Sequence, residues 1–362
     1  MQEQAVANPI APGPLSTEQR RAPAQSGAES GPASQASRST LKKPERYPWL
    51  DVLRALAIGD IVGIHVAGFH PMLGMGLPVF LLCTFALGAK RTPPHPWKQN
   101  AIRRASRLLI PWLVWSAFYG VVNTVRAARS GNERFGDLTN PELAWLWTGT
   151  EVLLWYLPFA FLAEVLINTI LQGTDRWHNR RPTLATFAWV GGGIAGPIGL
   201  AVAFGDRTLL PFMSNYAQGA LLIPMGIGLG LLLRYYRQSI STVATLIVAG
   251  GVTMAVMTLA PQFGLVDPDD RITDWLWRLG LGLALIGGTL AIPGRVPALL
   301  GWLAMFTFPI YLLHIFVEWP VGRVLHYAVG DVPGWAYWLI IWAASLGAAV
   351  VVKRLPLVKN VC

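Results

Sequence analysis

Four ionisable residues stand within an otherwise apolar stretch, LDVLRALAIGDIVGIH, that covers residues 50–65. They are Asp51, Arg54, Asp60 and His65. A neutral imidazole can take up a proton near neutral pH, and a guanidinium binds phosphate or carboxylate groups. His65 and Arg54 could therefore serve as a general base and an anion-binding group, if one element positions both.

A helix would place three of these groups on one face. At about 100° per residue, Arg54 and His65 lie within about 20° of each other, and Asp51 lies about 40° to the other side. The stripe from Arg54 to His65 would be about 16 Å long. Asp51 and Arg54 could also form a structural salt bridge. Asp60 points elsewhere, so we expect it to contact a neighbouring helix.

The chain is too apolar for a water-soluble domain, because 53% of its residues are hydrophobic and 13% are charged, against about 25% charged in an ordinary soluble domain. An ionisable group at membrane depth costs about 2.5 to 3.5 kcal/mol, so the stripe should face a wet cavity. We therefore predict an all-α integral membrane protein, a bundle of about ten transmembrane helices. The expected spans are 48–69, 73–89, 107–125, 150–171, 183–204, 213–233, 240–260, 274–292, 298–318 and 334–352.

The positive charges predict the orientation of these spans. Eighteen Lys and Arg residues lie in the loops and span ends on the same side of the membrane as the N-terminus, and seven lie on the opposite side. The positive-inside rule then places both termini in the cytoplasm. The net charge of +10 needs no nucleic-acid partner. We expect 1–45, rich in Ala, Pro, Ser and Gln, to be a disordered cytoplasmic tail, 46–352 the transmembrane domain and 353–362 a cytoplasmic tail.

Other motifs indicate packing instead of chemistry. Cys83 and Cys362 lack a neighbouring metal-ligand pattern and the six His residues are scattered, so we expect no metal. Two GxxxG spacings lie within spans and predict close helix contacts. They are formed by Gly192 with Gly196 and by Gly226 with Gly230.

Five segments, in order, resemble the membrane acyltransferase 3 family. The family's first helix, in which Arg and His are separated by ten residues, is similar to RYPWLDVLRALAIGDIVGIH. Its second helix is similar to GLPVFLLCTFALGAKR, although Cys83 and Thr84 stand here in place of the usual Ser-Gly pair. RRASRLLIPWLVWS, LLWYLPFAFL and FPIYLLHIF resemble three later segments. The resemblance covers about 46–350 and implies the short, membrane-only form in the bacterial inner membrane.

The resemblance implies an O-acyltransferase that moves an acetyl group from acetyl-CoA to a carbohydrate hydroxyl. His65 would be the base, and a covalent acetyl-histidine is the less favoured alternative. Arg54 would orient the thioester, while Arg103, Arg104 and Arg107 would bind the coenzyme A phosphates, unless they only reflect the positive-inside bias.

Acceptor contacts are expected from two further segments. Tyr311, His314 and Glu318 share one helical face, from which His314 could line the same cavity as His65, bind the acceptor or cap a neighbouring helix. Glu151, Trp155 and Tyr156 begin the fourth span, where the two rings could instead form an interfacial belt. The acceptor would be a cell-envelope or exported polysaccharide or its lipid-linked precursor. The alternatives are a transporter of a lipid-linked sugar or polar solute, with His65 as a proton relay, and a scaffolding subunit.

Overall fold

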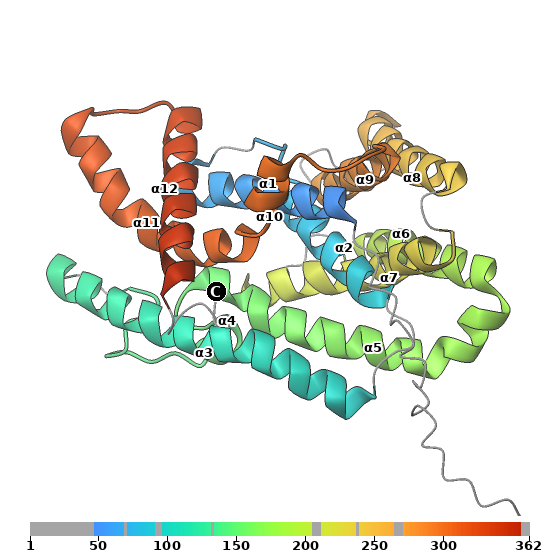
Figure 1. Cartoon of the computed structure of the whole chain (residues 1–362), viewed down its shortest axis with the longest axis horizontal. Helices are drawn as coiled ribbons and strands as arrows, with labels where there is room; N and C mark the ends of the chain where they lie inside the picture. Colours follow the sequence, from blue (N-terminus) through green and yellow to red (C-terminus); the bar gives the residue numbers. More distant parts are fainter. Residues whose placement is uncertain are drawn as a thin grey trace, which may run out of the picture. The chain divides into compact units, whose positions relative to one another are not determined.

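The computed structural model describes residues 47–68, 71–90, 96–131, 134–204, 211–236, 239–263 and 271–355. The expected tail at 1–45 lies outside these ranges, as does most of 353–362. Within the described ranges all regular structure is helical (Figure 1). The helices are α1 Pro48–Ala67, α2 Gly76–Ala89, α3 Trp97–Ser130, α4 Trp145–Thr148, η1 Val152–Trp155, α5 Tyr156–Arg180, α6 Pro182–Phe204, α7 Pro211–Tyr235, α8 Ile240–Leu259, η2 Ala260–Phe263, α9 Arg271–Ala291, α10 Ala298–Ala304, α11 Thr307–Ala328 and α12 Gly334–Arg354.

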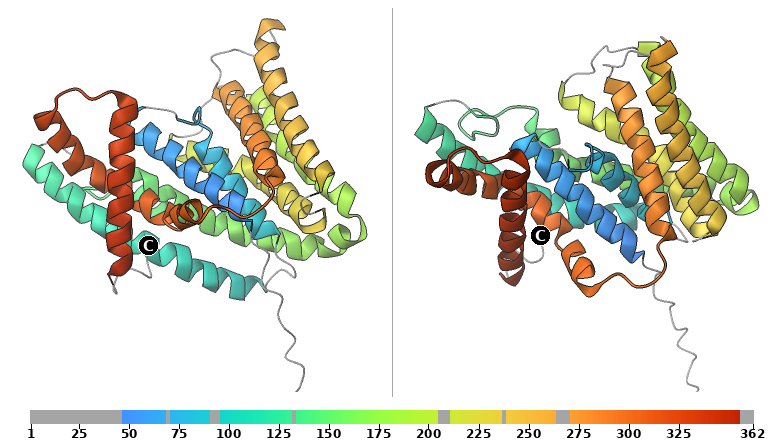
Figure 2. Two further views of the ribbon diagram at one scale, coloured as in Figure 1. Left: turned by 45° about the horizontal axis from the view of Figure 1, so that its top comes forward. Right: turned by 90° about the horizontal axis from the view of Figure 1, so that it is seen from above.

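The all-helical class is confirmed, and six segments are long and apolar enough to cross a membrane. They are Trp97–Ser130, Val152–Arg180, Asn215–Tyr235, Ile240–Leu259, Thr307–Ala328 and Gly334–Arg354, and Gly76–Ala89 is a shorter apolar helix. The helices do not all run parallel, since α3 and α5 lie side by side whereas α12 crosses α1 steeply (Figures 1 and 2). Neither the count of about ten spans nor the orientation of the termini is confirmed.

The expectation of one continuous helix over 298–318 is wrong. α10 ends at Ala304 and α11 begins at Thr307. The reason is Pro309, which lacks an N–H and whose ring would clash with the carbonyl of Met305 four residues earlier in a continuous helix. Proline is tolerated in the first turn of a helix, and that is where Pro309 lies in α11.

Asp60 connects α1 to α2, as its separate helical face indicates. Its carboxylate is fully buried and accepts hydrogen bonds from the N–H groups of Met72 at 2.8 Å and Gly76 at 2.7 Å. The first N–H groups of a helix have no partner within the helix, so Asp60 stabilises the start of α2. It does so from within the helix that carries Arg54 and His65.

One of the two GxxxG spacings makes a close helix contact. A methyl group on Gly226 would overlap Phe85, and one on Gly230 would overlap Ala89, because α7 packs directly on α2. Gly192 and Gly196 of α6 have open space at the corresponding position.

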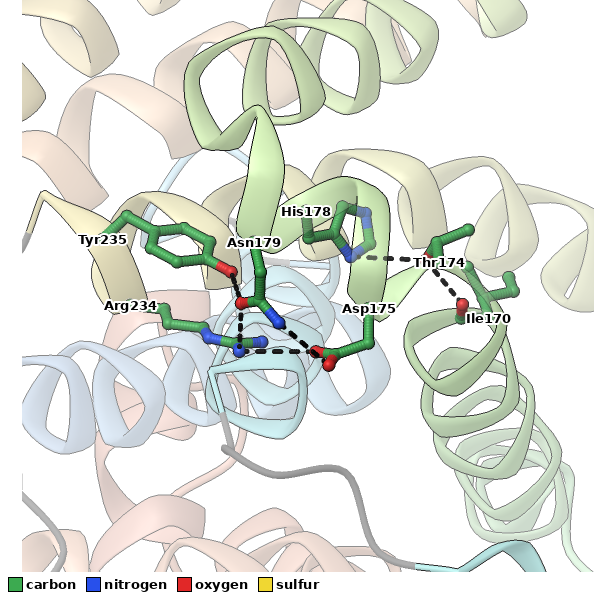
Figure 3. Close-up of polar contacts among 7 residues, drawn as sticks. All are labelled: Ile170, Thr174, Asp175, His178, Asn179, Arg234 and Tyr235. Atoms are coloured by element: carbon green, nitrogen blue, oxygen red, sulfur yellow. Dashed lines mark hydrogen bonds and ion pairs between the residues drawn. The ribbon is translucent and has the colours of Figure 1, made fainter. Parts of the chain in front are cut away.

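A polar cluster joins the end of α5 to the end of α7 (Figure 3). The Asn179 side chain donates to Asp175 at 2.9 Å and accepts from Arg234 at 3.1 Å and from the Tyr235 hydroxyl at 2.8 Å. Arg234 also lies 3.5 Å from Asp175. These contacts hold the far end of α5, the helix that carries part of the site described next.

Candidate active site

A pair of histidines, His65 near the end of α1 and His314 of α11, lies at the centre of the candidate site. Their ring centroids are 5.5 Å apart, with His65 exposed and His314 fully buried. The sequence predicted a role for each residue but not that they meet. Contacts between α1 and α11 bring them together.

Both imidazoles are held in the same way. His65 Nδ1 lies 2.8 Å from the carbonyl of Ile61, and His314 Nδ1 lies 2.8 Å from the carbonyl of Tyr311. Because a carbonyl only accepts, each Nδ1 carries the proton and each neutral ring keeps a lone pair on Nε2. The buried Nε2 of His314 has no hydrogen-bond partner among the described residues. The histidine pair can therefore accept a proton or a hydrogen bond from a bound group.

A cavity of about 420 Å³ lies among the first half of α1, α2, the first half of α3, α5, the start of α11 and the end of α12. We call it the arginine cavity, because Arg54, Arg104, Arg107 and Lys353 line it together with one carboxylate, Glu164. Its remaining lining is mostly apolar and includes Phe80, Leu108, Pro111, Tyr156, Phe308 and Pro309. Four cations against one carboxylate suit a polyanionic ligand.

The cations of the arginine cavity differ in their partners. Arg104 forms an ion pair with Glu164, and both side chains are buried. Arg54 lies 3.6 Å from Asp51, too far for a hydrogen bond, and its guanidinium lies over the Phe80 ring at 5.2 Å. The expected pairing of Asp51 with Arg54 is thus present but loose, which leaves Arg54 able to bind a ligand.

Of the expected phosphate-binding residues, the structure brings Arg54, Arg104 and Arg107 to this cavity. Arg103 is exposed and is not among the lining residues. Two faces of α3 could carry a pair of arginines. Arg103 and Arg107, four residues apart, share the first face, and Arg104 and Arg107, three residues apart, share the second. The packing of α3 on α5 turns the second face inward.

A continuous series of rings connects the arginine cavity to the histidine pair. Phe80 contacts Tyr156 at 5.1 Å, Tyr156 contacts Tyr311 at 5.6 Å and Tyr311 contacts His314 at 6.2 Å, measured between centroids. Phe80, Tyr156 and Tyr311 are all buried, and the Tyr311 hydroxyl donates to the carbonyl of Leu153. These packed rings separate the arginine cavity from the histidine pair, and neither histidine lines that cavity.

A second cavity, of about 380 Å³, lies at the other end of α11. We call it the Trp319 cavity. It is lined by Arg126 of α3, by Glu318, Trp319, Gly322, Arg323, His326 and Tyr327 of α11, and by Tyr337 of α12. Glu318 follows His314 by one helical turn, a rise of about 6 Å.

α11 therefore connects all three parts of the site. Phe308 and Pro309 line the arginine cavity, His314 belongs to the histidine pair, and Glu318 begins the Trp319 cavity. The buried Tyr119 of α3 donates its hydroxyl hydrogen to the carbonyl of Leu312 at 2.5 Å, which fixes α11 against α3 beside the histidines.

The residues expected to contact an acceptor lie in different surroundings. Trp155 is buried against Phe159 and Tyr216, while Tyr156 lines the arginine cavity. Glu151 accepts hydrogen bonds from the Asn123 side chain and from the N–H of Val152, each at 3.3 Å. Burial raises the pKa of the Glu151 carboxyl, and the Asn123 hydrogen bond opposes that shift. None of these residues lines the Trp319 cavity.

Sequence reasoning missed several residues of the site. Glu164 had a usable signal, because a carboxylate in the middle of an apolar span indicates a partner or a function. Lys353 and Arg126 stand at span ends, where the positive-inside rule and ordinary solubility already explain a cation. Only the fold shows that they line cavities.

Comparison with known families adds an independent finding. A family model described as an acyltransferase domain matches residues 47–354, nearly the whole described chain. No curated protein and no solved structure matches the sequence.

Proposed function

This chain belongs to the acyltransferase 3 family and has the apolar helices of a multi-pass membrane protein; on that premise we propose that it is an O-acetyltransferase of the bacterial inner membrane. The donor is cytoplasmic acetyl-CoA, and the acceptor is a hydroxyl of a cell-envelope or exported polysaccharide or of its lipid-linked precursor. One observation carries the proposal: the histidine pair lies between a cationic cavity and a second polar cavity along α11.

The donor occupies the arginine cavity. Coenzyme A carries several phosphate charges, and guanidinium groups bind phosphate through paired hydrogen bonds. Arg54, Arg104, Arg107 and Lys353 supply the positive charge, and Glu164 holds Arg104 in place. The pantetheine arm then extends past Tyr156 and Tyr311 toward the histidines.

The reaction takes place at His65, which is the exposed member of the histidine pair. The acceptor hydroxyl oxygen attacks the thioester carbonyl carbon while His65 Nε2 takes the hydroxyl proton. A carbon–oxygen bond forms, the carbon–sulfur bond breaks, and coenzyme A leaves as a thiolate that takes up a proton. In this proposal a bound reactant donates a hydrogen bond to the Nε2 of His314, which has no partner among the described residues.

The test compares acetylation by the parent chain and by His65→Asn. Asparagine can still donate a hydrogen bond to the Ile61 carbonyl, so the fold should persist, but it has no basic nitrogen to take up a proton. Loss of a general base costs about 10² to 10⁴ in rate. We expect the acetyl content of extracellular polysaccharide to fall to background in cells with His65→Asn, at an equal amount of membrane-inserted protein. Equal acetyl content in both strains would refute the assignment.

A biochemical measurement completes the test. Transfer of labelled acetyl groups from acetyl-CoA by purified protein should also fail in His65→Asn. Arg54→Gln should raise the acetyl-CoA concentration needed for half-maximal rate, because Arg54 lines the donor cavity and is only loosely paired with Asp51. An unchanged donor dependence in Arg54→Gln would remove Arg54 from the donor site.

A further inference from the structure

The Trp319 cavity contains two cations that the reaction above does not use. Arg126 comes from α3 and Arg323 from α11, and both guanidinium groups lie against the ring of Trp319, at 5.3 Å and 4.8 Å from its centroid. Such cation–ring contacts orient each guanidinium but do not neutralise it. The ring thus holds two positive charges near each other.

These cations have no ion-pair partner in the part of the chain that the structure describes. The Nε of Arg126 is buried there and makes no hydrogen bond. The one carboxylate that lines the cavity, Glu318, accepts a hydrogen bond from the Tyr337 hydroxyl at 3.0 Å and forms no ion pair with either arginine. Two unpaired guanidinium groups that share a cavity repel each other, and an anion bound between them would relieve this.

The charges specify the kind of anion. Arg126 and Arg323 contribute two positive charges and Glu318 one negative charge, so these three groups of the cavity lining sum to +1. A ligand group with a single negative charge matches this balance, whereas a doubly charged phosphate would meet Glu318. Glu318 and Tyr337 can in addition bind hydroxyl groups, which a sugar provides.

We propose that the Trp319 cavity binds the acceptor through one singly charged anionic group, so that the acceptor is an acidic carbohydrate. The inference rests on the proposed function, because it assigns this cavity to the substrate that receives the acyl group. The group is a uronate carboxylate or a sugar phosphodiester, which share this chemistry. A sugar bound at Glu318 would lie one helical turn along α11 from His314 of the histidine pair.

The experiment measures binding by the full chain in nanodiscs of phosphatidylcholine, which carry no net charge. The probes are tetragalacturonate, its fully methyl-esterified form and an oligomer of glycerol phosphate. The variants are Arg126→Gln and Arg323→Gln, singly and together. Arg129→Gln is the matched control, since Arg129 is exposed on α3 and does not line the cavity.

We expect at least one anionic probe to bind the parent about tenfold or more tightly than the methyl ester. The double variant should lose this preference, each single variant should lose part of it, and Arg129→Gln should keep it. Preference for tetragalacturonate identifies the carboxylate, and preference for the glycerol phosphate oligomer identifies the phosphodiester. Either result supports the proposal.

Three results would overturn it. One is equal binding of charged and uncharged probes, or no binding of any. Another is an equal effect of Arg129→Gln and Arg126→Gln, which would indicate general surface charge. The third comes from a parallel set of nanodiscs that contain phosphatidylglycerol: if the arginine variants change only the retention of that lipid, the cavity binds a lipid headgroup.

Acetyl transfer is measured separately on the same preparations. Charge-dependent binding without transfer from acetyl-CoA would refute the proposed function and leave the binding site in place. Transfer to neutral oligosaccharides that is unaffected in Arg126→Gln and Arg323→Gln would refute this inference and leave the acyltransferase assignment intact.

Discussion

Variants of the buried ion pair between Arg104 and Glu164 can distinguish an effect on the stability of the fold from an effect on donor binding. The two side chains are 7% and 10% exposed. Removal of one partner leaves a buried charge without its counterion, at a cost of about 3 to 5 kcal/mol. Because the pair lines a cavity large enough to admit water, we expect the lower end, about 3 kcal/mol, for Arg104→Leu and for Glu164→Leu.

The double variant should behave differently from the sum of the single variants. When both charges are replaced by apolar side chains of similar volume, the change is often close to neutral. We therefore expect a loss of about 1 kcal/mol or less in the double variant, whereas additivity would give about 6 kcal/mol. The assay is reversible unfolding of the purified protein in mixed micelles. Additive losses would show that the pair is not a coupled, buried unit.

The same double variant also tests the donor site. It should fold like the parent but bind acetyl-CoA more weakly by about tenfold or more, because the cavity has lost one of its guanidinium groups. Arg103→Leu is the matched control, since Arg103 is the neighbouring arginine of α3 and is exposed outside the cavity. If Arg103→Leu weakened donor binding as much as the double variant, the cavity would not be the donor site.

His314→Leu should lower acetyl transfer about tenfold, the worth of one hydrogen bond to a reactant. It should cost little stability, because the Nε2 that it removes has no partner among the described residues and Nδ1 makes a single hydrogen bond, to Tyr311; a matching loss of stability and activity would contradict this. Gly230→Ala should lower the thermal midpoint by forcing α7 away from α2, whereas Gly192→Ala should not, and equal effects would disprove the close contact. Glu151→Gln should gain stability relative to the parent as the pH rises. Because the pKa of Glu151 is raised in the folded state, its ionisation above the unfolded-state pKa destabilises the folded parent, and glutamine avoids this cost. A difference in thermal midpoint that did not change with pH would contradict the burial of that carboxyl.

Local patterns predicted what a single helix can determine. Periodicity predicts the helical class, the shared face of Arg54 and His65, and the separate face of Asp60. Asp60 indeed contacts the segment before α2 and the first residue of α2. The break before α11 was also present in the sequence as Pro309, but the apolar run across it hid the signal. A run of apolar residues reports burial, whereas the backbone of Pro309 decides where the helix starts.

What could not be predicted depends on which helices meet. Helical spacing allowed Arg103 with Arg107 or Arg104 with Arg107 to face inward, and the contact with α5, through Glu164, selects the second pair. The meeting of His65 with His314 requires contact between α1 and α11, two helices far apart in sequence. No local signal contains that information, because it depends on the packing of the whole chain.

The start of α11 explains why the two cavities share one axis. α11 begins beside Pro309, its first turn faces the arginine cavity, and the following turns have fixed heights along the axis. His314 then lies about 7.5 Å beyond Pro309, and Glu318 about 6 Å beyond His314. A donor bound at the first turn and an acceptor bound beyond Glu318 would both be near His314, and His65 lies beside it. On the proposed function, the start of α11 would set the spacing between the two substrates, with the histidine pair between them.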